Sequence, residues 1–180
     1  MNIKVLVPTG ALGITYCKKA LERSLKEKPD IIVVDGGSTD SGPAYLGKGK
    51  SKYSRSSTKS EWKTLMVARE KLKIPLLIGS AGTCGTDKTV DWFLEITKEL
   101  AKELNQNIKI TLLKCSQSKK NINKAFLSKN LSPLNNAPKI SSKKIINCTN
   151  IVGLAGVEQI TEAINTLSLI HISEPTRRYR

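Results

Sequence analysis

The sequence predicts an α/β domain with an open, mostly parallel sheet of about five strands and helices on both faces, a three-layer, Rossmann-like arrangement. Apolar runs rich in β-branched residues alternate with helical patterns along the chain, as in successive βαβ units. These runs are continuous, which indicates strands that are covered on both faces. The chain has 180 residues, 39% hydrophobic and 25% charged, which suits one soluble domain with a real core.

Five apolar runs are the expected strands, and a loop of small residues follows each of them. In chain order these runs are residues 3–7, 31–34, 75–78, 108–113 and 151–154. Helical patterns occupy residues 15–27 and 87–104 and the segment "VEQITEAI". The pattern at 87–104 is the clearest, because its apolar residues keep the three-and-four spacing of a buried stripe. Two polar segments, 43–60 and 131–144, are expected to be loops outside the sheet.

The loop in "IGSAGTCGTDKTVDW" is the strongest candidate for a binding site. In open parallel sheets, ligands bind at the carboxyl ends of the strands, and this loop joins such an end to the start of a helix. Its glycines permit tight turns, and the free N–H groups of the helix attract anions. We expect a phosphate or carboxylate here, bound by Ser80, Gly82, Thr83, Gly85, Thr86 and Asp87. The alternative is that Thr86 or Asp87 only caps the helix.

A second candidate loop, "VVDGGSTDSGP", follows the second expected strand and holds two aspartates. A carboxylate at a strand end suits acid/base chemistry, a metal ion or a ribose hydroxyl. Asp35 is the first candidate for a catalytic role and Asp40 the second, with no particular metal predicted and the cofactor unknown. The candidate ligand-binding residues are Gly36, Gly37, Ser38 and Thr39, joined at the same edge by Thr9 and Gly10 of "PTGALG". The alternative is a turn held by Asp and Ser side chains.

Charge and cysteine content narrow the class of partner. The formal charge is +15, and residues 105–157 contain nine lysines and no acidic residue. This balance could indicate nucleic acid, but the basic segments lack the stacking aromatics of single-strand binders, so a solvated basic surface is preferred. No run is long enough to span a membrane, and the N-terminus does not resemble a signal peptide. Four separated cysteines without a CxxC motif suggest reduced thiols in the cytoplasm.

Several strings together resemble the acyclic terpene utilisation (AtuA-like) family. They are "VLVPTGALG", "VDGGSTDSGP", "LGKGKSKYSR", "IPLLIGSAGTCGTDKTVDW" and "IVGLAGVEQI", in order from about residue 4 to residue 160. The resemblance is to the N-terminal part of longer, cytoplasmic bacterial proteins linked to catabolism of acyclic terpenes through acyl-CoA intermediates. It implies that residues 35–42, 51–55 and 79–87 form family loops. The pathway suggests a lyase- or hydratase-like step, without giving a mechanism.

The last 14 residues, "LSLIHISEPTRRYR", differ from the rest of the chain. They hold three of the six arginines and no lysine, and "LSLIHISEPTR" is similar to the translation of a widely used transposase sequencing adapter. We therefore expect residues 1–166 to be an α/β ligand-binding domain truncated from a longer protein, and residues 167–180 to be non-native. Without this tail the charge is +13, since three arginines and one glutamate are removed.

Three functional hypotheses remain open. The first is part of an enzyme that binds an anionic small molecule, an acyl-CoA or a carboxylate, at the loops described above. The second is a non-catalytic binding or scaffold subunit of a larger complex. The third is a basic nucleic-acid-binding protein, which would bind with a steep salt dependence. No membrane partner is expected, and a homo-oligomer stays open.

Overall fold

The computed structural model of the chain describes residues 2–37, 43–165 and 170–172. It confirms a mixed α/β architecture with a parallel sheet. Strands β1 (Val5–Leu6), β2 (Ile31–Asp35) and β3 (Leu76–Gly79) pair directly with one another in chain order. Strand β4 (Ile110–Leu112) joins them only through β5 (Ile170–Ile172), which pairs with β3 on one side and with β4 on the other.

The prediction of about five strands is wrong for residues 1–166. Residues 151–154, predicted as the last strand, form none, and Val152 makes only an isolated antiparallel bridge to Ser116. Three strands, β1 to β3, pair directly in this part of the chain. The strand that connects them to β4 is β5, which lies after residue 166.

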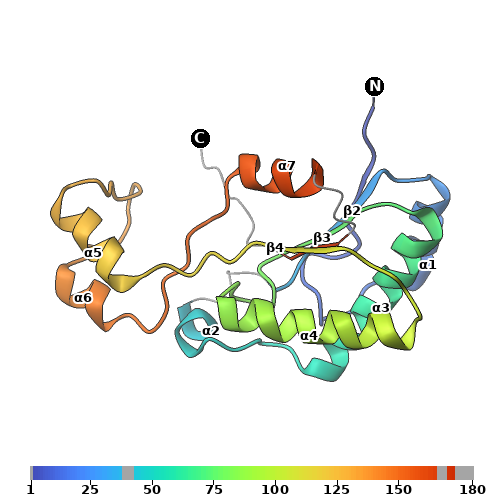
Figure 1. Cartoon of the computed structure of the whole chain (residues 1–180), viewed down its shortest axis with the longest axis horizontal. Coiled ribbons are helices and arrows are strands. Elements are labelled where there is room, and N and C mark those ends of the chain that lie inside the picture. The colour runs from blue at the N-terminus through green and yellow to red at the C-terminus, as the bar shows by residue number, and fades with distance from the viewer. Residues whose placement is uncertain (1, 38–42, 166–169, 173–180) are drawn as a thin grey trace.

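Two long helices pack side by side on one face of the strands (Figure 1). These are α3 (Arg55–Leu72) and α4 (Asp87–Glu103). Helix α7 (Val157–Asn165) lies on the opposite side of the strands (Figure 1). The shorter α1 (Lys18–Lys26) contributes Leu21 to the core, which otherwise consists mainly of side chains from β2, β3, α3 and α4. The predicted helix at 87–104 is therefore confirmed almost to the residue.

The prediction of a loop at residues 43–60 is wrong. This segment forms α2 (Pro43–Lys48) and the first turns of α3, which begins after Ser54, whose hydroxyl accepts a hydrogen bond from the Ser57 N–H. The apolar stripe of α3 is short because polar residues occupy buried positions at both ends of it. Thr58 is buried near the start of the helix and Arg69 near its end, so periodicity of apolar residues alone does not reveal the full helix.

Helices α5 (Lys119–Leu127) and α6 (Ser142–Asn147) pack against each other away from the sheet (Figure 1). Residues 131–144 were predicted as a loop, which is correct as far as Ser141, where the hydroxyl caps α6. None of the helices in the described residues is long and apolar enough to cross a membrane.

Candidate functional site

Three of the small-residue loops meet at the carboxyl ends of β1, β2 and β3. The Leu12 N–H donates to the Asp35 carbonyl at 2.8 Å, which joins the first loop to the second. The Gly36 N–H donates to the Gly79 carbonyl at 2.6 Å, and the Thr83 N–H donates to the Gly36 carbonyl at 3.1 Å. The structure therefore brings together loops that lie more than 60 residues apart in the sequence, as parallel strands require.

The backbones of the second and third loops approach each other so closely that only glycine fits at the contact. A Cβ atom on Gly36 would lie 2.7 Å from the Ser80 carbonyl oxygen, and one on Gly37 would lie 2.8 Å from the Thr83 Cα. The Asp35 carboxylate accepts a hydrogen bond from the Gly37 N–H at 3.0 Å, the geometry of the turn alternative. The other candidates of this loop, Ser38, Thr39 and Asp40, lie outside the described residues.

The third loop, residues 79–86, is buried along its whole length. The Thr86 hydroxyl accepts a hydrogen bond from the Thr89 N–H and so caps α4. The Asp87 N–H donates to the Ser116 hydroxyl, and the Asp87 carboxylate accepts from the Ser116 N–H, each at 3.0 Å. This geometry matches the capping alternative, because protein groups already use N–H groups at the helix start. A role of these residues in ligand binding stays a prediction.

This buried loop also has an unusual backbone. Ser80 has a φ of 47° and Thr83 a φ of 76°, although neither is a glycine, while Gly82 and Gly85 take similar values at 64° and 61°. A left-handed conformation costs a non-glycine residue about 1–3 kcal/mol, and such residues cluster at functional sites. The loop is thus held in a strained form by the packing around it.

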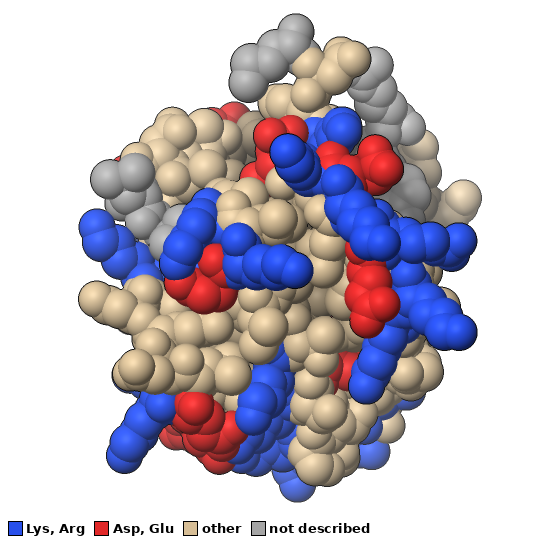
Figure 2. All heavy atoms as spheres, turned by 90° about the vertical axis from the view of Figure 1, so that its right-hand side faces the viewer, with Lys and Arg blue, Asp and Glu red and all other residues tan. Residues whose placement is uncertain are grey.

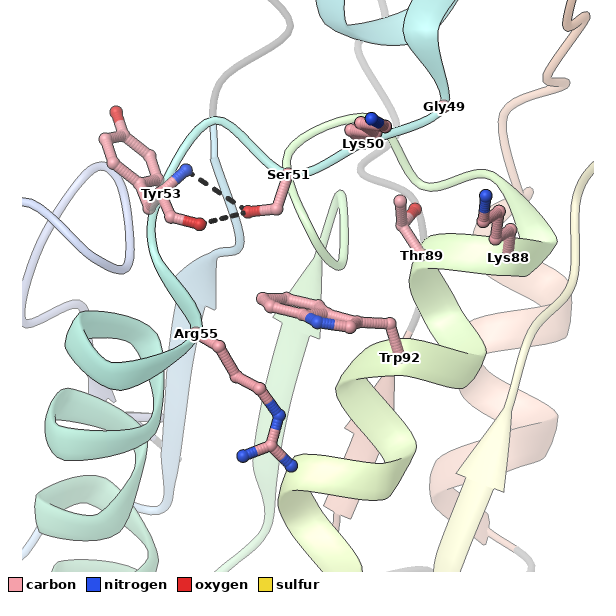
Figure 3. Close-up of a pocket in the computed structure, with 8 residues that line it drawn as sticks. All are labelled: Gly49, Lys50, Ser51, Tyr53, Arg55, Lys88, Thr89 and Trp92. Carbon is pink, nitrogen blue, oxygen red and sulfur yellow. Dashed lines mark hydrogen bonds between the residues drawn. The ribbon is translucent and has the colours of Figure 1, made fainter.

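A cavity of about 320 Å³ lies beside the loop junction, between residues 49–55 and the first turns of α4 (Figure 3). The Lys52 N–H donates to the Thr83 hydroxyl at 2.9 Å, so the segment that forms one wall is attached to the glycine-rich loop. The lining residues are Gly49, Lys50, Ser51, Tyr53, Arg55, Lys88, Thr89 and Trp92. Three of these are cationic, two are aromatic and none is acidic, which is a suitable composition for an anion.

The cations of the cavity differ in how their charge is compensated. Arg55 pairs with Glu99 at 2.5 Å. Within residues 2–37 and 43–165, neither Lys50 nor Lys88 forms an ion pair with a carboxylate. Lys88 also lies in the first turn of α4, where the helix dipole disfavours a cation. A bound anion would offset both charges.

The patterns in the sequence do not predict this cavity. No candidate ligand-binding or catalytic residue predicted from the sequence lines it. The available signal is the resemblance, which implies that residues 51–55 form a family loop. Only the tertiary fold shows that this loop and the first turns of α4 face one cavity.

The first loop is held by α3. The Glu61 carboxylate accepts a hydrogen bond from the Gly13 N–H at 2.6 Å, and the Ser57 hydroxyl donates to the Gly13 carbonyl at 2.7 Å. The Thr9 hydroxyl bonds locally to the Ala11 backbone, and a side chain at Gly10 would meet open space. Neither candidate lines the cavity described above.

Burial raises the pKa of Glu61 above its ordinary value of 4.5, although the Gly13 N–H partly opposes this. A raised pKa means that the folded state favours the neutral acid, so stability from this group is present at low pH and lost as pH rises through the folded pKa. Glutamine keeps an acceptor for the Gly13 N–H but does not titrate. We therefore expect the free energy of unfolding of Glu61→Gln to rise relative to that of the wild type as the pH goes from about 4 to about 7. Urea unfolding at both pH values measures this, with exposed Glu95→Gln as the control. An equal response of the two variants to pH would contradict the expectation.

The charged surface on the side of α1 and α3 carries many basic side chains with acidic ones among them (Figure 2). A network of ion pairs also joins α3 and α4, in which Lys59 pairs with Glu99 and Glu103. No group of three or more His, Cys, Asp or Glu that could hold a metal occurs in the described part of the chain.

Comparisons with protein-family models, curated proteins and solved structures find no match to this chain.

Proposed function

We propose that this protein binds an anionic small molecule, an acyl-CoA or a carboxylate, in the cavity between residues 49–55 and α4. The observation that carries the proposal is the presence of Lys50, Arg55 and Lys88 around one cavity without an acidic residue in its lining. The strained loop to which the cavity wall is attached through the Lys52–Thr83 hydrogen bond supports the proposal, because strain of this kind is typical of functional sites. We also propose that the fold is a three-layer, Rossmann-like arrangement, in which α3 and α4 form one helical layer and α7 belongs to the other.

The wider role that we propose is catabolic and cytoplasmic, in a bacterial protein similar to the acyclic terpene utilisation family. The support is the resemblance of the loop sequences, which places the ligand among acyl-CoA intermediates. In this proposal Asp35 is the first candidate acid or base, for a lyase- or hydratase-like step, and Asp40 the second. The loops at Thr9, Asp35 and Gly79 would then place the reacting group beside the anion site, since their backbones are joined.

One observation favours the alternative of a non-catalytic binding subunit. The Asp35 carboxylate accepts the Gly37 N–H, so it has a structural use in the turn that joins the loops. Binding of acyl-CoA by the wild type without any turnover would support the binding subunit, and turnover that is lost in Asp35→Asn with ligand affinity retained would support the enzyme. A nucleic-acid partner has less support, because acidic side chains lie among the basic ones on the surface in Figure 2.

The experiment is a titration of acetyl-CoA into the wild type and a double variant, Lys50→Ala with Lys88→Ala. We expect the dissociation constant to rise at least about tenfold, because two charges that contact the anion are removed. The matched control is Lys98→Ala with Lys102→Ala, which removes the same charge from exposed positions of α4. Equal losses in the two double variants would show that net charge, not the cavity, determines binding.

A further inference from the structure

We propose that the cavity binds the adenosine phosphate end of its ligand, with the base stacked on Trp92 and the phosphates on Lys50 and Lys88. The inference deepens the proposed function and rests on it. It assigns the cavity to a nucleotide-like group, and therefore places the acyl or carboxylate end of the ligand elsewhere.

Trp92 offers an aromatic surface to the cavity. Its side chain extends from α4 into the space beside Lys50 and Ser51 (Figure 3). One part of the indole packs on the protein, since a Cβ on Gly82 would lie 3.3 Å from Trp92 Cε3 and the Phe93 ring centroid is 6.4 Å away. The side chain is only half-buried, unlike Trp62, which is fully buried in the core. Trp92 is thus an aromatic side chain that packs partly on the protein and is partly open to a ligand.

The cations of the cavity lie around the indole of Trp92. In Figure 3 Lys50 and Lys88 stand on the upper side of the cavity and Arg55 on the lower side, with the indole between them. Ser51 holds the backbone of this wall, because its hydroxyl accepts from the Tyr53 N–H at 3.2 Å and donates to the Tyr53 carbonyl at 3.1 Å. Gly49, with a φ of 58°, turns the chain directly before Lys50. Lys50 is therefore placed by a structured segment, and Lys88 by the first turn of α4.

The combination of groups decides the class of ligand. A small carboxylate needs cations but no aromatic surface, and an acyl chain needs apolar surface but not three cations. A nucleotide needs both, because its base stacks on an aromatic ring and its phosphates bind Lys and Arg. The volume of about 320 Å³ is at the lower end of the range for small-molecule sites. This space suits a nucleotide-sized group, with the remainder of an acyl-CoA outside it.

The test compares ADP with inorganic pyrophosphate as probes, by titration calorimetry on the full chain. We expect ADP to bind the wild type about tenfold or more tightly than pyrophosphate, because stacking adds to the phosphate contacts. In Trp92→Leu the affinity for ADP should fall to that for pyrophosphate, while pyrophosphate binds as before. Trp92→Phe, which keeps an aromatic surface, should retain most of the difference. ADP should also compete with acetyl-CoA.

The result that would overturn the inference is equal affinity of the wild type for ADP and pyrophosphate, or an equal loss of both in Trp92→Leu. If that variant fails to fold, the wild type still decides, because Trp62 is buried and Trp92 is the tryptophan that a ligand can reach. ADP should then quench the fluorescence and pyrophosphate should not. If acetyl-CoA binding depends on Lys50 and Lys88 while ADP and pyrophosphate bind equally, only the nucleotide assignment fails and the anion site stands.

Discussion

Trp62→Ala is expected to lower the free energy of unfolding by about 3–5 kcal/mol, the range for truncating a buried aromatic residue. Trp62 is fully buried between α3 and α4. Its ring contacts Phe93 edge-on at a centroid distance of 4.8 Å, and its Nε1 donates to the buried Thr97 hydroxyl at 3.0 Å. The variant would lose apolar burial, the aromatic pair and the hydrogen bond together, because one side chain makes all three contacts.

Urea unfolding followed by circular dichroism measures this loss, with Trp62→Phe as the matched variant. Phenylalanine keeps most of the apolar contact but removes the hydrogen bond to Thr97, so we expect a smaller cost than for alanine. A loss below about 1 kcal/mol in Trp62→Ala would mean that α3 and α4 do not share the core described here. The pair also matters for the site, since α3 carries Arg55 at its start and α4 carries Lys88 and Trp92.

Gly36→Ala is expected to lower the free energy of unfolding by about 1–3 kcal/mol, as overpacking does in well-packed interiors. The new methyl group would lie 2.7 Å from the Ser80 carbonyl oxygen, 2.8 Å from the Gly79 carbonyl oxygen and 3.0 Å from the Ala81 Cα. All three are backbone atoms of a buried loop, so no side chain can rotate away to make space. The second and third loops must separate, which also moves the segment attached through Thr83 and Lys52.

The control for this variant is Gly10→Ala, because a Cβ on Gly10 has no heavy atom within 4 Å. We expect Gly10→Ala to unfold at nearly the same urea concentration as the wild type, and Gly36→Ala to unfold earlier and to bind acetyl-CoA less tightly. Similar unfolding midpoints for the two variants would contradict the close approach of the loops.

The elements that the sequence predicts well are those with a complete local signal. Helix α4 has an uninterrupted apolar stripe and a capping Thr86, so its bounds follow from periodicity. Helix α3 has Arg69 buried where the stripe needs an apolar residue, and Arg69 is stabilised there by Glu70 at 2.9 Å. Residues 151–154 have the composition of a strand, but no strand among the described residues pairs with them, and pairing partners are a tertiary property.

The candidate site was predictable in part for the same reason. The parallel sheet implies that loops after β1, β2 and β3 share one edge, and the backbone bonds among Leu12, Asp35, Gly36 and Gly79 bear this out. The sequence does not show that the glycine-rich loop is buried or that residues 49–55 lie beside the first turns of α4. The cavity is formed by tertiary packing. In the sequence, its lysines do not differ from those of a solvated surface.

The titration of acetyl-CoA into the wild type and the Lys50→Ala/Lys88→Ala variant tests the central claim most directly. The account predicts binding by the wild type, a rise of at least about tenfold in the dissociation constant of this variant, and little change in Lys98→Ala/Lys102→Ala. Both double variants should unfold like the wild type, since the substituted lysines are exposed. An unchanged dissociation constant in Lys50→Ala/Lys88→Ala would contradict an anion site in this cavity.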